Sequence, residues 1–423
     1  MTPNTVMIVM GSMMLVIVVL VIFIWSIKRH RAPKVHLDCD GSIADLIPSL
    51  AGLTLSSAVA GNSVEVLENG AFFDVLLEHM SKAQKTLHFE TFLWKEGTLG
   101  QRVVEVMTER ARAGVKVRVL VDANGCSGMG KDAQRQLREA GCKLARFHDY
   151  SLKHIGVVNE RDHRKLVVLD GRIAFVGGHC VVDSWLGDAE DGEHFADVSV
   201  MLRGPIVGGV QAAFSENWGA ETGELIAGDD VFPELENAGE VRAHVVYAKP
   251  EGSAPAVKIL HHSVICLARK RLWIQNPYFI PEPEAVEALG KAVARGVDVR
   301  VMMPSTSGSD NPMVQHAGHW NFDKLLRLGV RLFEYPHTLL HQKVVTVDGV
   351  WSAVGSSNFD DRSFEINDEL TVGILDEATA KRLDAVFERY MPRCKEIRLE
   401  EWRRRSLLLR VREAAAYAIN ELL

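Results

Sequence analysis

Two stretches of this 423-residue chain repeat one pattern of apolar and polar positions. Residues 162–178 read DHRKLVVLDGRIAFVGG, and residues 340–357 read LHQKVVTVDGVWSAVGSS. Each copy runs from His-x-Lys through four apolar or small residues to Asp-Gly, and then through a second apolar run to Gly-Gly or Gly-Ser. Because Asp-Gly between two apolar runs is a strong hairpin signal, each copy predicts two antiparallel strands joined at that turn.

The segments before the two copies also correspond, so the chain reads as a duplication. Apolar runs that predict buried strands match in three pairs: residues 85–93 with 271–280, 114–122 with 296–304, and 137–147 with 325–335. Residues 100–113 and 283–295 place apolar side chains at helical spacing and end before Gly, which predicts helices between the strands. This alternation predicts an α/β fold in which helices sandwich a mostly central sheet. We expect two similar α-β-α halves, residues 61–228 and 240–395, that face each other across a shared cleft.

The N-terminus has a different pattern, because residues 6–27 are almost entirely apolar and carry no charge. A helix of that length is roughly 33 Å long, enough to cross a bilayer core. The preceding MTPNT lacks the basic region of a cleaved signal peptide, and the apolar run is longer than such peptides use. We therefore expect one retained transmembrane helix. The basic residues at 28–31 follow it directly, which places the body of the protein in the cytoplasm by the positive-inside rule.

Two further segments flank the predicted halves. Residues 28–60 read as a linker. Residues 396–423 read as a basic C-terminal helix in which arginines stand beside Leu and Ala. Two interpretations of that helix stay open: it lies on an anionic membrane, or its apolar face packs on the second half.

The composition narrows the class of protein. Hydrophobic residues make up 47% and charged residues 24% of the chain, and the net charge is −7, so there is no general basic field and no nucleic-acid partner is expected. Six scattered Cys form no CxxC pair and predict neither a disulfide framework nor a zinc site, which fits a reducing compartment. We expect no metal and no cofactor.

The two His-x-Lys pairs carry the candidate chemistry. Side chains two apart on a strand share a face, so His163 points with Lys165, and His341 with Lys343. An imidazole beside an ammonium suits a phosphate, because one group attacks or moves a proton while the other holds negative charge. Two such pairs on one phosphodiester predict double displacement through a covalent phosphohistidine, with the second His as acid and base.

The Asp of each copy has two interpretations. The signature is usually written with all three letters, so Asp170 and Asp348 stay among the candidate catalytic residues. Their position at the end of an apolar run, directly before Gly, favours a role in the turn.

Other polar residues are candidates for supporting the site. A reactive His needs a carboxylate on its other ring nitrogen, and Asp197 and Glu369 stand at matching places on the strand after each hairpin. Ser356, Asn358 and the backbone amides of Gly177 and Gly178 are candidate phosphate donors, although a Gly pair also permits close strand packing. Cys180 takes the place of Asn358 in the first half.

On these motifs the chain resembles the phospholipase D (HKD) superfamily. Four stretches, together with the N-terminal anchor and EEWRRRS near the C-terminus, resemble bacterial cardiolipin synthases of that type: residues 61–70, 276–289, 295–304 and 355–370. The resemblance covers nearly everything from residue 60 onward. It implies an enzyme of the bacterial inner membrane that joins two phosphatidylglycerol molecules into cardiolipin and releases glycerol. It also implies that His163 is the nucleophile and His341 the acid and base.

Several alternatives stay open at this point. Superfamily membership also allows a phospholipase D hydrolase, another phosphatidyl transferase, a membrane-anchored nuclease or a non-catalytic scaffold. Five residues are either lining for a lipid channel or core: Trp273, Tyr278, Phe279, Met302 and Met303. His316 and His319 share one face of a predicted helix; they either line a lipid headgroup pocket or are ordinary surface positions, and the second interpretation is favoured. The single anchor differs from the two spans of many relatives.

Overall fold

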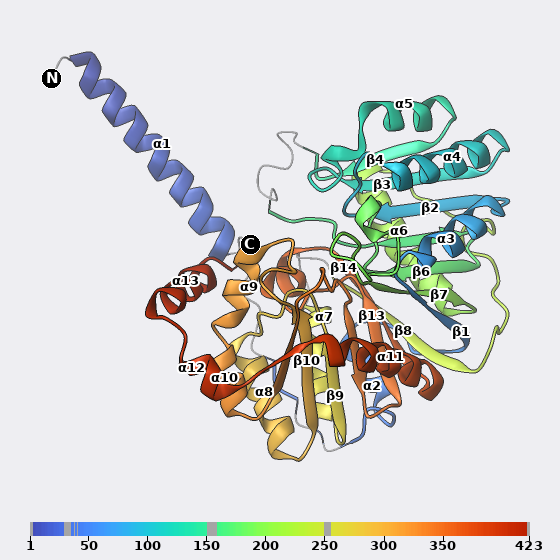
Figure 1. The fold of residues 1–423 in the computed structure, drawn as a ribbon. Helices are drawn as coiled ribbons and strands as arrows, with labels where there is room; N and C mark the ends of the chain where they lie inside the picture. The colour runs from blue at the N-terminus through green and yellow to red at the C-terminus, as the bar shows by residue number, and fades with distance from the viewer. Residues whose placement is uncertain are drawn as a thin grey trace.

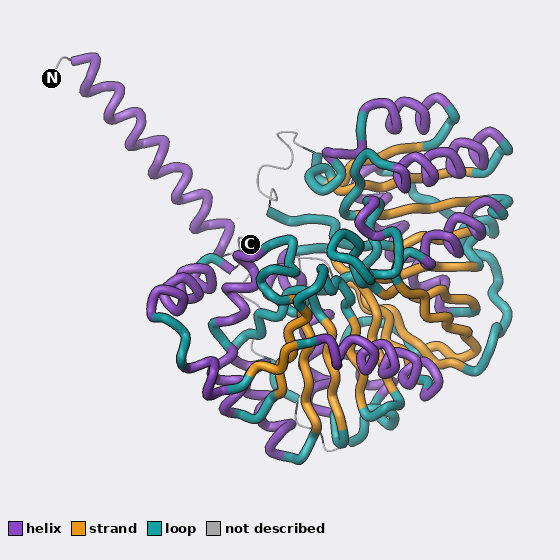
Figure 2. Tube along the Cα trace, viewed as in Figure 1, coloured by secondary structure: helices purple, strands orange, loops and turns teal. Residues whose placement is uncertain are grey.

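A single mixed sheet organises the body of the protein (Figures 1 and 2). The computed structural model describes residues 3–28, 35–37, 39, 41–149, 159–248 and 255–420. Within these residues the sheet has fifteen strands, in the order β15-β11-β10-β9-β12-β13-β14-β8-β1-β7-β6-β5-β2-β3-β4.

The strand order is mirrored about the contact between β1 and β8. The first half contributes β1 (Val59–Glu68), β2 (Thr86–Thr91), β3 (Lys116–Asp122), β4 (Lys143–Phe147), β5 (Leu166–Leu169), β6 (Ile173–Gly177) and β7 (Val198–Arg203). The second half contributes β8 (Val241–Ala248), β9 (Arg271–Gln275), β10 (Asp298–Pro304), β11 (Arg331–Tyr335), β12 (Val344–Val347), β13 (Trp351–Gly355), β14 (Glu369–Leu375) and the extra edge strand β15 (Lys395–Ile397). In each half three strands run parallel and the hairpin strands antiparallel, as the duplicated sequence pattern predicts.

Helices cover both faces of this sheet. Those of the first half are α3 (Ala71–Ser81), α4 (Thr98–Arg112), α5 (Lys131–Glu139) and α6 (Ile206–Thr222). The second half carries α7 (Ala256–Leu267), α8 (Pro283–Ala294), α9 (Pro312–His319), α10 (Phe322–Arg327) and α11 (Glu377–Tyr390). Short turns of helix are η1 (Ser127–Met129), η3 (Asp183–Trp185), η4 (Arg362–Ile366) and η5 (Met391–Arg393). Helices on both faces agree with the expected α-β-α sandwich.

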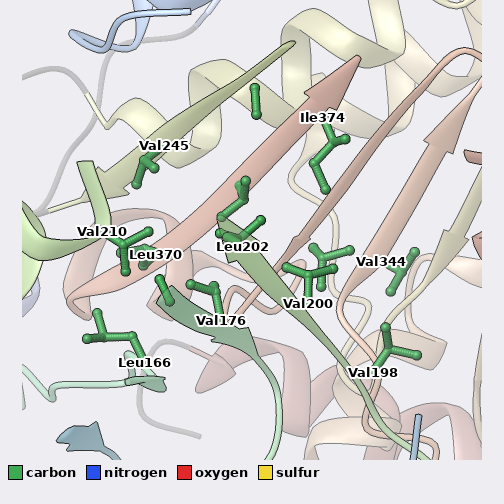
Figure 3. Packing of buried hydrophobic residues seen from close by; sticks show 14 of the residues in the cluster. Leu166, Val176, Val198, Val200, Leu202, Val210, Val245, Val344, Leu370 and Ile374 are labelled. Carbon is green, nitrogen blue, oxygen red and sulfur yellow. The ribbon is translucent and has the colours of Figure 1, made fainter. Parts of the chain in front are cut away.

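One of the three main cores is shared by the two halves (Figure 3). There Val200 and Leu202 of β7 lie in the same cluster as Val372 and Ile374 of β14, under α6 and α11. All four side chains are fully buried, and each such burial contributes about 1.5–3 kcal/mol relative to exposure. The continuous sheet and the shared core make the two halves one packed body, and they fix the positions of the two His-x-Lys motifs relative to each other.

Helix α1 (Pro3–Lys28) stands away from this body (Figure 1). Among the described residues it is the one helix long and apolar enough to cross a membrane, and none of its residues 4–21 is buried by the rest of the protein. Residues 29–31 of the basic flank lie outside the described residues.

Two of the expected segment assignments need correction. The segment interpreted as a linker contains α2 (Ile47–Leu53), whose Ile47 and Leu50 are buried in the core of the second half. The C-terminal segment is not one helix: it begins with most of β15 and continues as α12 (Leu399–Arg403) and α13 (Leu407–Ala418). In both segments the secondary structure depends on tertiary packing, which the local sequence pattern does not indicate.

The two motif aspartates close the hairpin turns. Asp170 and Asp348 adopt left-handed backbone angles, with φ of 54° and 56°. The Asp170 carboxylate accepts hydrogen bonds from the backbone N–H groups of Gln84, Lys85 and Thr86, where β2 begins. Asp348 accepts the equivalent bonds before β9. Each Asp directly follows its strand, whereas the His lies three residues before that strand, so the Asp carboxylate is committed to the turn and the turn interpretation is favoured over a catalytic role.

Candidate active site

Two short bridges between the halves build the site. Asp162 pairs with Asp368, and Leu340 pairs with Ala196. The next residue on each segment is then a motif histidine facing a carboxylate: His163 meets Glu369, and His341 meets Asp197. Each histidine is therefore held by the half to which it does not belong.

In the first pair, His163 Nδ1 lies 2.8 Å from Glu369 Oε1. Glu369 is fully buried, and the hydroxyl of Ser356 donates to its other oxygen. Burial alone would raise the pKa of Glu369, but the His163 ring, Lys165 and the Ser356 hydrogen bond hold it below its usual value. The carboxylate is thus ionised and accepts the Nδ1 proton, so Nε2 of the neutral ring carries the lone pair.

The second pair uses a different supporting donor. His341 Nδ1 lies 2.7 Å from Asp197 Oδ2, and the indole N–H of Trp185 donates to the same oxygen at 2.7 Å. Gly178 stands where the second half has Ser356, and a Cβ there would lie only 2.3 Å from Asp197 Oδ1. The glycine is required by this close approach, and Trp185 supplies the hydrogen bond that a serine supplies in the other half.

The two lysines also differ in what they contact. Lys165 Nζ donates to the backbone carbonyl of His163 at 2.6 Å. Lys343 Nζ lies 2.8 Å from His341 Nε2 as well as from the His341 carbonyl. Since an ammonium only donates, His341 Nε2 accepts this bond, and the ring proton sits on Nδ1 facing Asp197.

Burial sets the charge state of the site. It lowers the pKa of His163 to about 4, against the opposing effect of Glu369, and Lys343 adds to the lowering. It also lowers the pKa of His341, to which Lys343 and Lys165 contribute. Burial brings the pKa of Lys343 down to about 7. Each imidazole is thus affected by the ammonium of the other half, which agrees with the backbone bridges that join the two motifs.

A cleft of about 410 Å³ opens over His163 and is lined by both halves. Arg161 and Arg362 are two cations in its wall, and Arg362 donates to the Asn159 side chain at 2.9 Å. These arginines and Trp185 were not among the sequence candidates. Arg161 lies two residues before His163, and Arg362 lies within the GSSNFDDRSFEINDEL stretch, so only proximity to the motifs could have indicated them.

The structure separates the remaining candidates. Asn358 lines the cleft and can present its amide to a phosphate. The amides of Gly177 and Gly178 donate to the carbonyls of Lys165 and Val198, so their assignment as phosphate donors is wrong. The Ser356 hydroxyl donates to the Glu369 carboxylate, so Ser356 helps to orient His163 through Glu369.

The structure also places the candidate channel residues, His316 and His319. Of the five candidate channel residues only Tyr278 lines the cleft; the rest are core: Trp273, Phe279, Met302 and Met303. His316 and His319 are buried, not at the surface. No group of three His, Cys, Asp or Glu side chains suited to a metal occurs among the described residues.

Comparison with known proteins gives the family. A family model described as "Cardiolipin synthase, PLD-like domain" matches residues 76–185 and 262–391. The chain is 35% identical to cardiolipin synthase A of Pseudomonas aeruginosa (strain LESB58), over 81% of this chain and 69% of that protein. It is 32% identical to a cardiolipin synthase of Geobacillus sp. (strain WCH70), over 85% of this chain and 72% of the relative. The chain belongs to the cardiolipin synthases of the phospholipase D type.

A solved structure agrees on the fold of this family member. The phosphatidylserine synthase of Haemophilus influenzae Rd KW20 superposes with a TM-score of 0.70, covering 88% of this chain and 98% of that one, at 13% identity. The family match confirms the expected enzyme class, and the superposition confirms the expected fold.

The two histidine–carboxylate pairs between the halves predict how the activity of this cardiolipin synthase family member changes when a carboxylate loses its charge. Glu369→Gln and Asp197→Asn keep the shape but remove the negative charge that fixes the tautomer and stabilises an imidazolium. We expect kcat to fall by about 10²–10⁴ in each variant, measured as product formed per folded enzyme.

Asp170→Ala is the matched control from the same motif. It removes a cap on three backbone N–H groups, so we expect a loss of about 1.5–3 kcal/mol in the free energy of unfolding. The kcat of its folded fraction should stay within about twofold of wild type. A collapse of kcat in Asp170→Ala, with unchanged stability, would return that residue to the catalytic set.

A pH profile follows from the shifted pKa values. His163 must be neutral to present a lone pair, so kcat/KM falls as the pH drops through about 4. The proton held by Lys343 and His341 is lost as the pH rises through about 7, so kcat/KM falls there too. In Lys343→Arg the guanidinium keeps its charge, so the alkaline limb should move above pH 9 while the acid limb stays. An alkaline limb that does not move in this variant would assign it to another group.

Proposed function

We propose that this enzyme makes cardiolipin from two phosphatidylglycerol molecules and releases glycerol, through a phosphatidyl group held on His163. The observation that carries the proposal is the pair of imidazoles, each held by a buried carboxylate of the opposite half and each beside a lysine, with His163 in the wall of the cleft. Phosphodiester exchange needs one nucleophile, one acid and base, and cations for the equatorial oxygens, and this set provides all of them.

The unequal lysine contacts support His163 as the nucleophile. Its Nε2 carries a lone pair, and that atom accepts no hydrogen bond from any of the described residues. His341 Nε2 already accepts from Lys343, which places an exchangeable proton beside it. In the first step His163 Nε2 bonds to phosphorus and the bond from phosphorus to the glycerol oxygen breaks. The glycerol oxygen takes the proton that Lys343 holds beside His341.

The second step runs the same groups in the opposite sense. The hydroxyl of a second phosphatidylglycerol gives its proton to His341 and bonds to phosphorus, and the bond to His163 breaks. Lys165, Lys343 and the Asn358 amide stabilise the phosphoryl oxygens, while Arg161 and Arg362 attract the anionic lipid headgroups into the cleft.

We also propose a location for the enzyme: the bacterial inner membrane, crossed once by α1, with the body in the cytoplasm. The apolar length of α1 and the basic residues that follow it support this arrangement. Protease added to sealed spheroplasts should leave the body intact and cut it only after lysis. Digestion before lysis would place the body on the outer side.

Product analysis tests the reaction. Full-length enzyme in phosphatidylglycerol vesicles with a chelator present should form cardiolipin and glycerol in equal amounts. Phosphatidic acid as the main product would make the enzyme a hydrolase, and loss of turnover in chelator would overturn the metal-free expectation.

A substrate with a good leaving group tests the roles of the two histidines. With a phosphatidyl p-nitrophenyl ester, departure needs no acid, so His341→Gln should release one burst of p-nitrophenolate per site and keep a phosphatidyl group on the protein. His163→Gln should show no burst. The reverse result would exchange the two roles.

A further inference from the structure

Helix α13 is held on the body in one fixed orientation. Its Glu413 and Ala416 are buried against the second half, with exposed fractions of 2% and 1%. The Glu413 carboxylate lies 2.6 Å from Arg405 and 4.0 Å from the buried His319 of α9. A buried ion pair of this kind fixes which face of the helix points outward.

The outward face of α13 is apolar, which inverts the usual pattern of a surface helix. Leu407, Leu408 and Val411 are 76%, 79% and 59% exposed, and Ile419 just beyond the helix is 43% exposed. At about 100° per residue these four positions occupy one arc of roughly 120° on the side away from the buried Ala416. A surface helix normally turns such an arc toward the core.

Cations and aromatic rings border this apolar arc. Arg410 and Arg412 are exposed and fall on its two edges. Next to the helix, Trp320 is 48% exposed and stacks on Tyr417 of α13, with ring centroids 5.9 Å apart. Apolar side chains between arginines, beside Trp and Tyr, form the composition of helices that lie in a membrane interface.

We propose that α13 docks in the headgroup layer of an anionic membrane. Charge complementarity favours this occupant, since the exposed Arg410 and Arg412 border the apolar arc and the exposed Arg403 and Arg404 come shortly before the helix. The same chain carries α1, so a bilayer is within reach of its body. In the view of Figure 1, α1 leaves the body at the end where α13 lies.

The docked helix borders the mouth of the active-site cleft. Asn420, two residues beyond α13, lines the cleft and donates to Asp361 at 3.1 Å. Val314 of α9, the helix on which α13 packs, also lines it. With α13 in the headgroup layer, the cleft opens at the level where phosphate groups lie. A lipid then brings its headgroup to His163 while its acyl chains stay in the membrane.

Crosslinking in the full-length enzyme tests the contact without relying on activity. Benzoylphenylalanine in place of Leu408, in vesicles of phosphatidylglycerol and phosphatidylcholine, should form lipid adducts on illumination. The same residue in place of Leu225, a 90% exposed leucine beyond α6, is the control and should form none. Adducts to a second copy of the chain, or no lipid adduct at position 408, would overturn the proposal.

Turnover on two forms of substrate gives a second readout. In Leu407→Glu/Leu408→Glu/Val411→Glu, three new anionic groups oppose the membrane, so turnover of vesicle phosphatidylglycerol should fall about tenfold or more. Turnover of a short-chain phosphatidylglycerol, dispersed as monomers, should change less than about twofold, because that substrate needs no docked surface.

The control for this readout is Leu225→Glu, which should leave both activities unchanged. Equal loss on the two substrate forms would show damage to the site instead of lost docking. Unchanged vesicle turnover in the triple variant would also overturn the proposal. Complete inactivity of the wild-type enzyme on both forms would refute the proposed reaction, while the crosslinking result would still decide the docking.

Discussion

The hydrogen bond between each motif histidine and a carboxylate of the opposite half is the interaction on which this enzyme depends. It exists because the residues just before each pair, Asp162 with Asp368 and Leu340 with Ala196, join in backbone bridges across the halves. The continuous sheet through β1 and β8 and the core shared under α6 and α11 hold those bridges in register. A half on its own would contain a histidine without its partner and a buried carboxylate without a histidine.

The electrostatic balance of the site follows from its burial. Isolating an ion from water costs several kcal/mol, so four buried charged side chains persist only because they lie beside one another. Burial lowers the pKa of Lys343 to about 7, so its ammonium form is the one that a nearby negative charge would stabilise. An arriving phosphate supplies the missing negative charge and stabilises the ammonium form of Lys343.

The sequence predicted the parts of this site that repeat. The duplicated period indicated the strands, the hairpins and the two His-x-Lys pairs, and the matching positions of Asp197 and Glu369 singled them out as orienting groups. It could not show that the pairs cross, because His163 and Glu369 are separated by 206 positions and only the sheet register brings them together.

Other errors had the same origin in packing. The sequence left the backbone amides of Gly177 and Gly178 available for a phosphate, but in the sheet they donate to backbone carbonyls. The local pattern also did not predict α2, because its few apolar residues form a helix that is buried only by packing against the second half. The arginines of α13 were visible in the sequence, but which face they border depends on the buried Glu413.

The mirrored strand order about β1 and β8 has a consequence for the direction of the proposed chemistry. The duplication sets one histidine from each half on one phosphorus, and in the proposed chemistry His341 serves both the departing and the arriving alcohol, so the site itself prefers neither sense of exchange. The bond broken and the bond formed are both ordinary phosphodiester linkages. The net flow must then come from outside the protein, as small, water-soluble glycerol diffuses away while both lipids remain in the bilayer.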